Sequence, residues 1–296
     1  MINKKIKRIA FNRAAMTYDD YSVLQKQISL DLFDRLSLIK MAPNFILDLG
    51  SGTGENNSGF KNIYKNKNKN KNKNKNKNKE IINYDFSERM LMRAKSKEKD
   101  FLGLNKLLGK NNISYICGDM EHLPIKKNLI DLVWTSSSLQ WCNDLNKTFL
   151  GIKEILNYGG LFIFSTFGPK TLTELSAINK KLSQNDTVNS FTDMHQIGDM
   201  LVANGFSDPV LDSDEYTLTY SNVEKLFVDI KSIGATSSNT LQKKGLRGRN
   251  YFKRLAAEYD KYKKSGLLPA TYEVIYGHAW NMNKNQNFKT FEIKHE

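Results

Sequence analysis

Apolar and polar positions follow two different periods along most of this chain. Short apolar runs, which predict buried strands, alternate with stretches of helical period between residues 44 and 167. The strands are apolar at nearly every position, as in a parallel sheet covered on both faces. We therefore expect right-handed β-α-β units and a doubly wound α/β sheet. The seven predicted strands cover residues 45–50, 80–86, 112–120, 129–139, 160–167, 209–220 and 270–280.

Helical periodicity occupies the stretches around these strands. Two helices are predicted before the first strand, over residues 5–16 and 21–37, and a third covers 144–156. We expect this third helix to end at Gly159 and Gly160, because glycine is common at helix C-termini. The remaining predicted helices cover residues 55–66, 87–96 (with Ser87 as N-cap), 192–206 and 222–235.

The pattern divides the chain into three parts. We expect a helical lid over residues 1–40 and a ligand-binding core over residues 41–170. Residues 171–296 would supply cap helices and the last two strands, which complete the sheet. A long basic connection over residues 241–264 is assigned to the cap.

One segment follows neither period. Residues 65–79 read KNKNKNKNKNKNKNK, a low-complexity repeat that cannot bury a core and is expected to be a disordered loop. Its eight lysines account for most of the formal net charge of +14 and leave +6 for the rest of the chain. The repeat also lacks aromatic residues for base stacking. We therefore expect no nucleic-acid partner.

Composition narrows the setting further. The chain has 296 residues, which is enough for one large domain with an added cap. No apolar run approaches the roughly 20 residues of a membrane span. Only two cysteines occur, without C-x-x-C spacing, and the four histidines form no metal-binding pattern. We expect a cytoplasmic, monomeric protein with no metal and no membrane contact.

The segment NFILDLGSGTGENN, residues 44–57, carries the most informative chemistry. Its apolar run reaches Asp48, and glycines follow at positions 50, 52 and 54. In an open α/β sheet, ligands lie at the carboxyl ends of the strands, where a glycine turn lets the backbone approach closely. The spacing G-x-G-x-G differs from the G-x-G-x-x-G that binds a pyrophosphate. This turn therefore predicts a nucleotide-like ligand of another kind.

Two more acids end the next two predicted strands. Asp85 follows Asp48 by 37 residues, or by 22 without the 15-residue repeat, close to the usual offset of a carboxylate that binds ribose hydroxyls. Asp119 ends the third strand, where it can accept a hydrogen bond from an adenine amino group. Three acids would repel a pyrophosphate, so they favour a ligand with ribose, adenine and a cationic group.

These motifs together resemble the class I S-adenosylmethionine-dependent methyltransferases. The resemblance covers residues 44–167 and rests on LDLGSGTG, YDFSERML, GDMEHLP, DLVWTSSSLQW and LNYGGLFIFSTF. It implies a Rossmann-like, seven-stranded, mostly parallel sheet with S-adenosylmethionine as cofactor. The implied contacts are Asp48, Gly50, Ser51, Gly52 and Gly54 at the methionine part, Asp85 at the ribose, Phe86, Asp119 and Met120 at the adenine, and Ser136 or Ser137 below the cofactor. At the second position of the turn, Ser51 replaces the cysteine that the family often has.

A narrower resemblance extends over most of residues 8–280. FNRAAMTYDDYSVLQKQ, SSSLQWCNDL, FSTFGPKTLTEL and IKSIGATSSN are similar to the malonyl-acyl-carrier-protein O-methyltransferases of biotin synthesis. This implies methylation of the free carboxylate of a malonyl thioester on acyl carrier protein or coenzyme A. A carboxylate is ionised at neutral pH and needs no general base, so alignment and desolvation would supply the catalysis. We expect Tyr18, Gln140 and Trp141 to line the acceptor side.

Two questions stay open at the level of sequence: which surface binds the carrier protein, and whether the protein has another function within the same superfamily. An acidic carrier protein would suit the basic residues of QKKGLRGRNYFKR, which are Lys243, Lys244, Arg247, Arg249, Lys253 and Arg254, although a solvated basic surface is an equally simple interpretation. A methyltransferase of quinones or other small molecules remains an alternative. A mitochondrial methyltransferase-fold protein that assists assembly of respiratory complex I is another.

Overall fold

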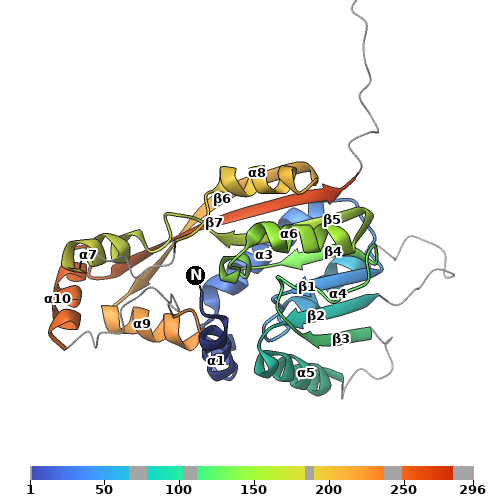
Figure 1. The fold of residues 1–296 in the computed structure, drawn as a ribbon. Helices are drawn as coiled ribbons and strands as arrows, with labels where there is room; N and C mark the ends of the chain where they lie inside the picture. Colours follow the sequence, from blue (N-terminus) through green and yellow to red (C-terminus); the bar gives the residue numbers. More distant parts are fainter. Residues whose placement is uncertain (1, 67–78, 103–111, 184–189, 237–248, 283–296) are drawn as a thin grey trace, which may run out of the picture.

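The computed structural model describes residues 2–66, 79–102, 112–183, 190–236 and 249–282. Within them, seven strands form one sheet in the order β3-β2-β1-β4-β5-β7-β6 (Figure 1). The five strands β1 to β5 are parallel, and β7 is antiparallel to both of its neighbours. The strands are β1 Phe45–Leu49, β2 Glu80–Asp85, β3 Asn112–Cys117, β4 Ile130–Thr135, β5 Leu156–Phe167, β6 Ser207–Tyr220 and β7 Leu268–Asn281. The predicted doubly wound, mostly parallel sheet is confirmed.

Most helices also match the periodicity of the sequence. The two predicted N-terminal helices correspond to α1 and α3, with the short α2 between them. Ser87 caps α5 as predicted, because its Oγ accepts a hydrogen bond from the amide of Met90 (3.3 Å). The helices are α1 Lys4–Ala14, α2 Tyr18–Tyr21, α3 Val23–Leu38, α4 Asn56–Asn66, α5 Glu88–Leu102, α6 Leu145–Ile155, α7 Thr173–Ser183, α8 Met194–Ala203, α9 Val223–Ser232 and α10 Arg249–Asp260. Helix α7 was not predicted, and α10 lies in the stretch that was predicted only as a basic connection.

The expected end of α6 at Gly159 and Gly160 was wrong. The helix ends at Ile155, and Leu156 already belongs to β5 and pairs with Ile130 in β4. Leu156 is fully buried, so its place in the core decides where the strand begins. The positive φ of Gly159 therefore lies within an irregular start of β5.

Two apolar layers hold the helices on the sheet. On one face, Phe33 of α3 stacks on Trp134 of β4 with ring centroids 4.2 Å apart, and Phe60 of α4 meets the same ring edge-on. On the other face, side chains of α6 and α8 such as Phe149 and Leu201 are completely buried against the sheet. Burial on both faces explains why the strands read as continuous apolar runs.

The hairpin of β6 and β7 extends beyond the sheet. β5 pairs with β7 only as far as Val274, whereas β6 continues the pairing to Leu268. Figure 1 shows α7, α9 and α10 gathered around this extension, all within the segment expected to form the cap. Helix α9 also contacts α1 and α2, so the cap and the N-terminal helices meet beside the sheet.

Strand order determines where a ligand can bind. The chain leaves β1 toward β2 and β3, then returns to β4 on the other side of β1. Such a reversal opens a crevice at the carboxyl ends of the central strands. Asp48 and Asp85 lie near these ends, and Asp119 lies two residues past β3.

Candidate cofactor site

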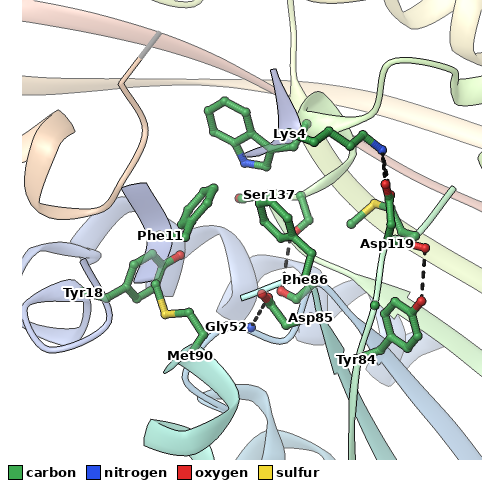
Figure 2. A pocket seen from close by; sticks show the side chains of 15 residues that line it. Lys4, Phe11, Tyr18, Gly52, Tyr84, Asp85, Phe86, Met90, Asp119 and Ser137 are labelled. Atoms are coloured by element: carbon green, nitrogen blue, oxygen red, sulfur yellow. Dashed lines mark hydrogen bonds and ion pairs between the residues drawn. The ribbon is translucent and has the colours of Figure 1, made fainter. Parts of the chain in front are cut away.

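A pocket lies at the carboxyl ends of β1 to β4. Figure 2 shows Phe11 and Tyr18 on one side of it, and Tyr84 and Asp119 on the other. It is lined by Lys4, Phe11, Tyr18, Gly50, Gly52, Tyr84, Asp85, Phe86, Met90, Gly118, Asp119, Met120, Ser137, Ser138 and Trp141.

The glycine turn forms the floor of the cavity next to β1. Gly50 has a φ of +80°, and a Cβ there would lie 2.3 Å from Oγ of Ser138. Gly54 has a φ of +74°, and a Cβ there would lie 2.9 Å from Cβ of Ala94 on α5. Gly50 thus lets the turn approach the β4 loop, and Gly54 lets α5 pack against it.

Asp85 lies at the tip of β2 and is held rigidly. Its Oδ2 accepts a hydrogen bond from the amide of Gly52 (3.0 Å), and its Oδ1 accepts one from the amide of Ser87 (2.7 Å). Burial raises the pKa of the Asp85 carboxyl to about 6, although both amides favour the ionised form. Each oxygen retains a lone pair, so the group can still accept from the hydroxyls of a ribose.

Asp119 lies past the tip of β3 and is engaged by a lysine of the lid. Nζ of Lys4 is 2.7 Å from Oδ1 and 2.6 Å from Oδ2 of Asp119, and 2.6 Å from Oε1 of Glu121. Partial burial alone would raise the pKa of Asp119, but the hydrogen bonds and charge of Lys4 outweigh it and keep the pKa below its ordinary value. Asp119 therefore stays ionised at neutral pH.

Asp48 supports the turn from below and does not line the cavity. It is completely buried, and its Oδ2 accepts a hydrogen bond from Nδ2 of Asn56 at the start of α4 (3.0 Å). Oδ1 has no hydrogen-bond partner among the described residues. Burial raises the pKa of Asp48 to about 7, and the nearby charge of Asp85 adds to the effect. Two buried carboxyls with raised pKa values favour a cationic ligand close by.

The lid side of the cavity is mainly aromatic. Phe11 of α1 meets both Phe86 and Trp141 edge-on, with ring centroids 5.6 Å apart in each pair. Tyr18 of α2 lies close to Phe11 and Met90 in Figure 2. Burial raises the pKa of the Tyr18 phenol, and the neighbouring acids add to this, so Tyr18 stays protonated and can donate a hydrogen bond.

Asp19 fixes α2 in this position. One of its oxygens accepts a hydrogen bond from Oγ1 of Thr53 in the glycine turn (2.5 Å). The other lies 2.7 Å from Nζ of Lys97 on α5. The lid is therefore attached to the same turn that forms the floor.

Not every predicted site residue reaches the cavity. Of the set, Tyr18, Trp141, Gly50, Gly52, Asp85, Phe86, Asp119 and Met120 line it, and so does Ser137, the alternative to Ser136. Ser136 is turned to Ser165, whose hydroxyl donates to it (3.3 Å). Gln140 donates to the carbonyl of Ser137 (2.6 Å) and accepts from Thr166 (3.3 Å), so both ends of its amide are engaged. Besides Asp48, the residues outside the lining are Ser51, Gly54, Ser136 and Gln140.

Several lining residues were missed from the sequence. Lys4 and Phe11 come from α1, whose apolar and basic positions had no visible link to the strand tips. Met90 lies within the motif YDFSERML but was not singled out. Phe11 lies within the segment FNRAAMTYDDY, so a closer reading of that resemblance could have included it. Tyr84, Gly118 and Ser138 lie within the recognised motifs YDFSERML, GDMEHLP and DLVWTSSSLQW but were not singled out.

Comparison with known proteins identifies the family. Residues 47–164 match the family model described as a methyltransferase domain. The malonyl-acyl-carrier-protein O-methyltransferase of Gallionella capsiferriformans is 40% identical over 95% of this chain and 91% of its own length. The chain belongs to the malonyl-acyl-carrier-protein O-methyltransferase family. A further member, from a Methylovorus species, is 39% identical over 95% of this chain and 90% of its own length. Another, from Nitrosospira multiformis, is 38% identical over 99% of this chain and 94% of its own length.

Solved structures show that this family member has the expected fold. The YcgJ protein of Bacillus subtilis matches with a TM-score of 0.56 and 14% identity over 86% of this chain and 98% of that one. A phosphoethanolamine N-methyltransferase of Haemonchus contortus, solved in complex with S-adenosyl-L-methionine, matches with a TM-score of 0.55 and 16% identity over 92% and 57%. At such identities the likeness concerns the fold alone.

Two features of other functional classes are absent from the described residues. In that part of the chain, no three or more His, Cys, Asp or Glu side chains are grouped so that they could hold a metal ion. None of its helices is both long and apolar enough to cross a membrane. The Lys-Asn repeat lies almost wholly outside the described residues, at 67–78.

Proposed function

We propose that this protein transfers the methyl group of S-adenosylmethionine to the free carboxylate of a malonyl thioester carried by acyl carrier protein. The observation that carries the proposal is a single cavity that joins a glycine turn to Asp85 and Asp119 at two neighbouring strand tips. Relatives that are 40% and 39% identical over 95% of this chain are named malonyl-acyl-carrier-protein O-methyltransferases. The product would be the malonyl methyl ester.

The residues of the cavity fit this cofactor. Gly50 and Gly118 allow close approach, since a Cβ on either would lie within 2.3 Å of a side-chain oxygen. Ser137 lines the cavity, and its buried Oγ has no hydrogen-bond partner among the described residues. We assign the ribose to Asp85, the adenine to Phe86, Asp119 and Met120, and the methionine part to the turn that Asp48 supports.

The chemistry asks little of the protein's side chains. The cofactor supplies an electrophilic methyl group on a positively charged sulfur. No proton has to move, because the acceptor carboxylate is already ionised. The fifteen lining residues include no histidine, in keeping with a reaction that needs no general base. The protein's contribution is to hold the two reactants together in a space from which water is excluded.

Lid and cap together enclose the acceptor side. The Lys7 side chain of α1 is only 1% exposed, and its Nζ lies 3.8 Å from the ring centre of Trp141. The same Nζ donates to the carbonyls of Gly234 and Thr236, just past α9. These contacts join the lid to the cap segment IKSIGATSSN. We place the malonyl group beside Trp141 and Tyr18, where burial would strip its carboxylate of water.

The carrier protein would dock on the cap. Lys253 and Arg254 on α10 are exposed and form no ion pair among the described residues, so they are available to acidic side chains. Arg249 begins the same helix. Lys243, Lys244 and Arg247, predicted for the same surface, lie outside the described residues. Complementary charge would mainly speed encounter with the carrier.

The decisive experiment supplies S-adenosylmethionine together with malonyl-acyl carrier protein, malonyl-coenzyme A or acetyl-acyl carrier protein, and follows the mass of each thioester. A gain of one methyl group on the malonyl carrier, and none on the acetyl carrier, is the expected result. Cofactor binding without an ester on any malonyl thioester would refute the acceptor assignment. Transfer to a phenolic quinone precursor instead would favour the small-molecule alternative.

Charge variants test the choice of carrier. Lys253→Glu with Arg254→Glu should slow methylation of the protein-bound substrate severalfold, and the loss should shrink at high salt. Methylation of malonyl-coenzyme A should change little, which makes it the internal control. Equal losses on both substrates would place the carrier elsewhere.

A further inference from the structure

The N-terminal helix α1 is attached to the loops that follow three strands. The amide of Ile2 donates to Asn143 in the loop after β4 (2.6 Å). Nε of Arg8 donates to the carbonyl of Phe86 after β2 (2.8 Å). Lys4 lies between these two attachments in sequence and reaches the loop after β3. Of these three residues of α1 and its N-terminus, Lys4 alone also lines the cofactor cavity.

Lys4 makes its contacts with two carboxylates at once. Its ammonium bridges Asp119 and Glu121, whose side chains are 35% and 10% exposed, and its own side chain is 26% exposed. Figure 2 shows the Lys4 side chain extending to Asp119 at the cavity wall. The amide of Glu121 donates to Oδ1 of Asp119 (3.1 Å), so the loop itself helps to orient the carboxylate.

Without this lysine the loop would hold two carboxylates two residues apart with no cation between them. They would repel each other, and Asp119 would turn toward water. With it, the ammonium keeps Glu121 as a second partner, so Asp119 can use one oxygen for another donor without leaving Lys4 uncompensated. Asp119 is the residue that the proposed function assigns to the adenine.

We propose that Lys4 is a positioning residue for the cofactor. Shared between Asp119 and Glu121, it fixes the Asp119 carboxylate so that one oxygen accepts a hydrogen bond from the exocyclic amino group of the adenine. This inference rests on the proposed cofactor site. It assigns to a lid residue a part in recognising the base, in addition to its part in closing the site. Glu121 acts through Lys4.

A binding cycle distinguishes positioning from simple lid closure. The ligands are S-adenosylhomocysteine and its analogue with hydrogen in place of the 6-amino group, and calorimetry gives the dissociation constants for wild type and Lys4→Gln. We expect Lys4→Gln to weaken the binding of S-adenosylhomocysteine about tenfold, as expected for the loss of a charge-assisted contact that is partly shielded by solvent. Binding of the analogue should weaken about threefold or less, because the analogue has no amino group that could donate a hydrogen bond to Asp119. This non-additivity is the signature of coupling.

Two further variants complete the test. Lys5→Gln removes the same charge from the neighbouring, exposed position of α1 and should leave both constants within about twofold of wild type. Glu121→Gln leaves Lys4 on Asp119 alone, so it should reduce the discrimination between the two ligands without loss of the fold. Equal weakening of both ligands in Lys4→Gln, or no weakening, would overturn the inference. If wild type binds neither ligand, the proposed cofactor site itself fails.

Discussion

Asp48 gives the sharpest test of how burial shapes this site. Its side chain is completely buried, with Asn56 donating to Oδ2 and no partner for Oδ1 among the described residues. Asp48→Asn keeps the shape of the side chain and removes its charge. If the carboxylate is held at a cost to the fold, the variant should be more stable where the wild type is ionised.

The size of the effect follows from the pKa. Burial raises the pKa of Asp48 from an ordinary value of 3.8 to about 7. Between these values the folded state keeps a proton that the unfolded state has released, so the free energy of unfolding falls as pH rises through this window. The difference corresponds to about 4 kcal/mol above pH 7. The buried amide of the variant offsets about 1 to 2 kcal/mol of this, which leaves a net gain of about 2 kcal/mol at pH 8 and none at pH 5.

Urea unfolding from pH 5 to pH 8, followed by tryptophan fluorescence, measures this difference. Asp34→Asn on the exposed side of α3 is the matched control, because it makes the same substitution at a position in contact with water. A stability difference between Asp48→Asn and wild type that is the same at every pH would refute the reasoning. So would a variant that loses more stability at pH 8 than at pH 5.

Other substitutions test separate parts of the structure. Gly50→Ala should abolish cofactor binding in calorimetry and lower the melting temperature, because its Cβ would lie 2.3 Å from a side chain. Gly52→Ala is the control, since a Cβ there meets nothing within 4 Å, and it should cost only about 1 kcal/mol of backbone strain. Burial lowers the pKa of Lys7 from 10.5 to about 7. Between these values the folded state has lost a proton that the unfolded state still binds, so the free energy of unfolding should rise with pH. Lys7→Met should remove that rise, as measured by urea unfolding at several pH values. Gly277→Ala should cost about 1 to 3 kcal/mol by urea unfolding, because a Cβ would lie 2.4 Å from the Phe164 ring, and less in a Phe164→Leu background.

The positions of the strand ends could be predicted because they depend on local pattern. Apolar runs buried on both faces require a covered parallel sheet, and parallel strands place their carboxyl ends at one edge. The offset between Asp48 and Asp85 became interpretable once the repeat was set aside. The register of the sheet agrees with this alignment of the two strands: β1 pairs residue by residue with β2, starting with Phe45 opposite Glu80.

Only the tertiary structure could decide which side chains complete the cavity. Lys4 and Asp119 are separated by 115 residues, and no period or motif connects them. Gln140 follows the right strand but forms hydrogen bonds with its own loop and β5, whereas Phe11 enters from the lid. The sequence by itself determined the sheet, the glycine turn and the acids at the strand tips, since these follow from burial and backbone geometry near each residue. The closing wall of the site depended on how α1 and the cap pack across distant loops, and that is settled by long-range contacts.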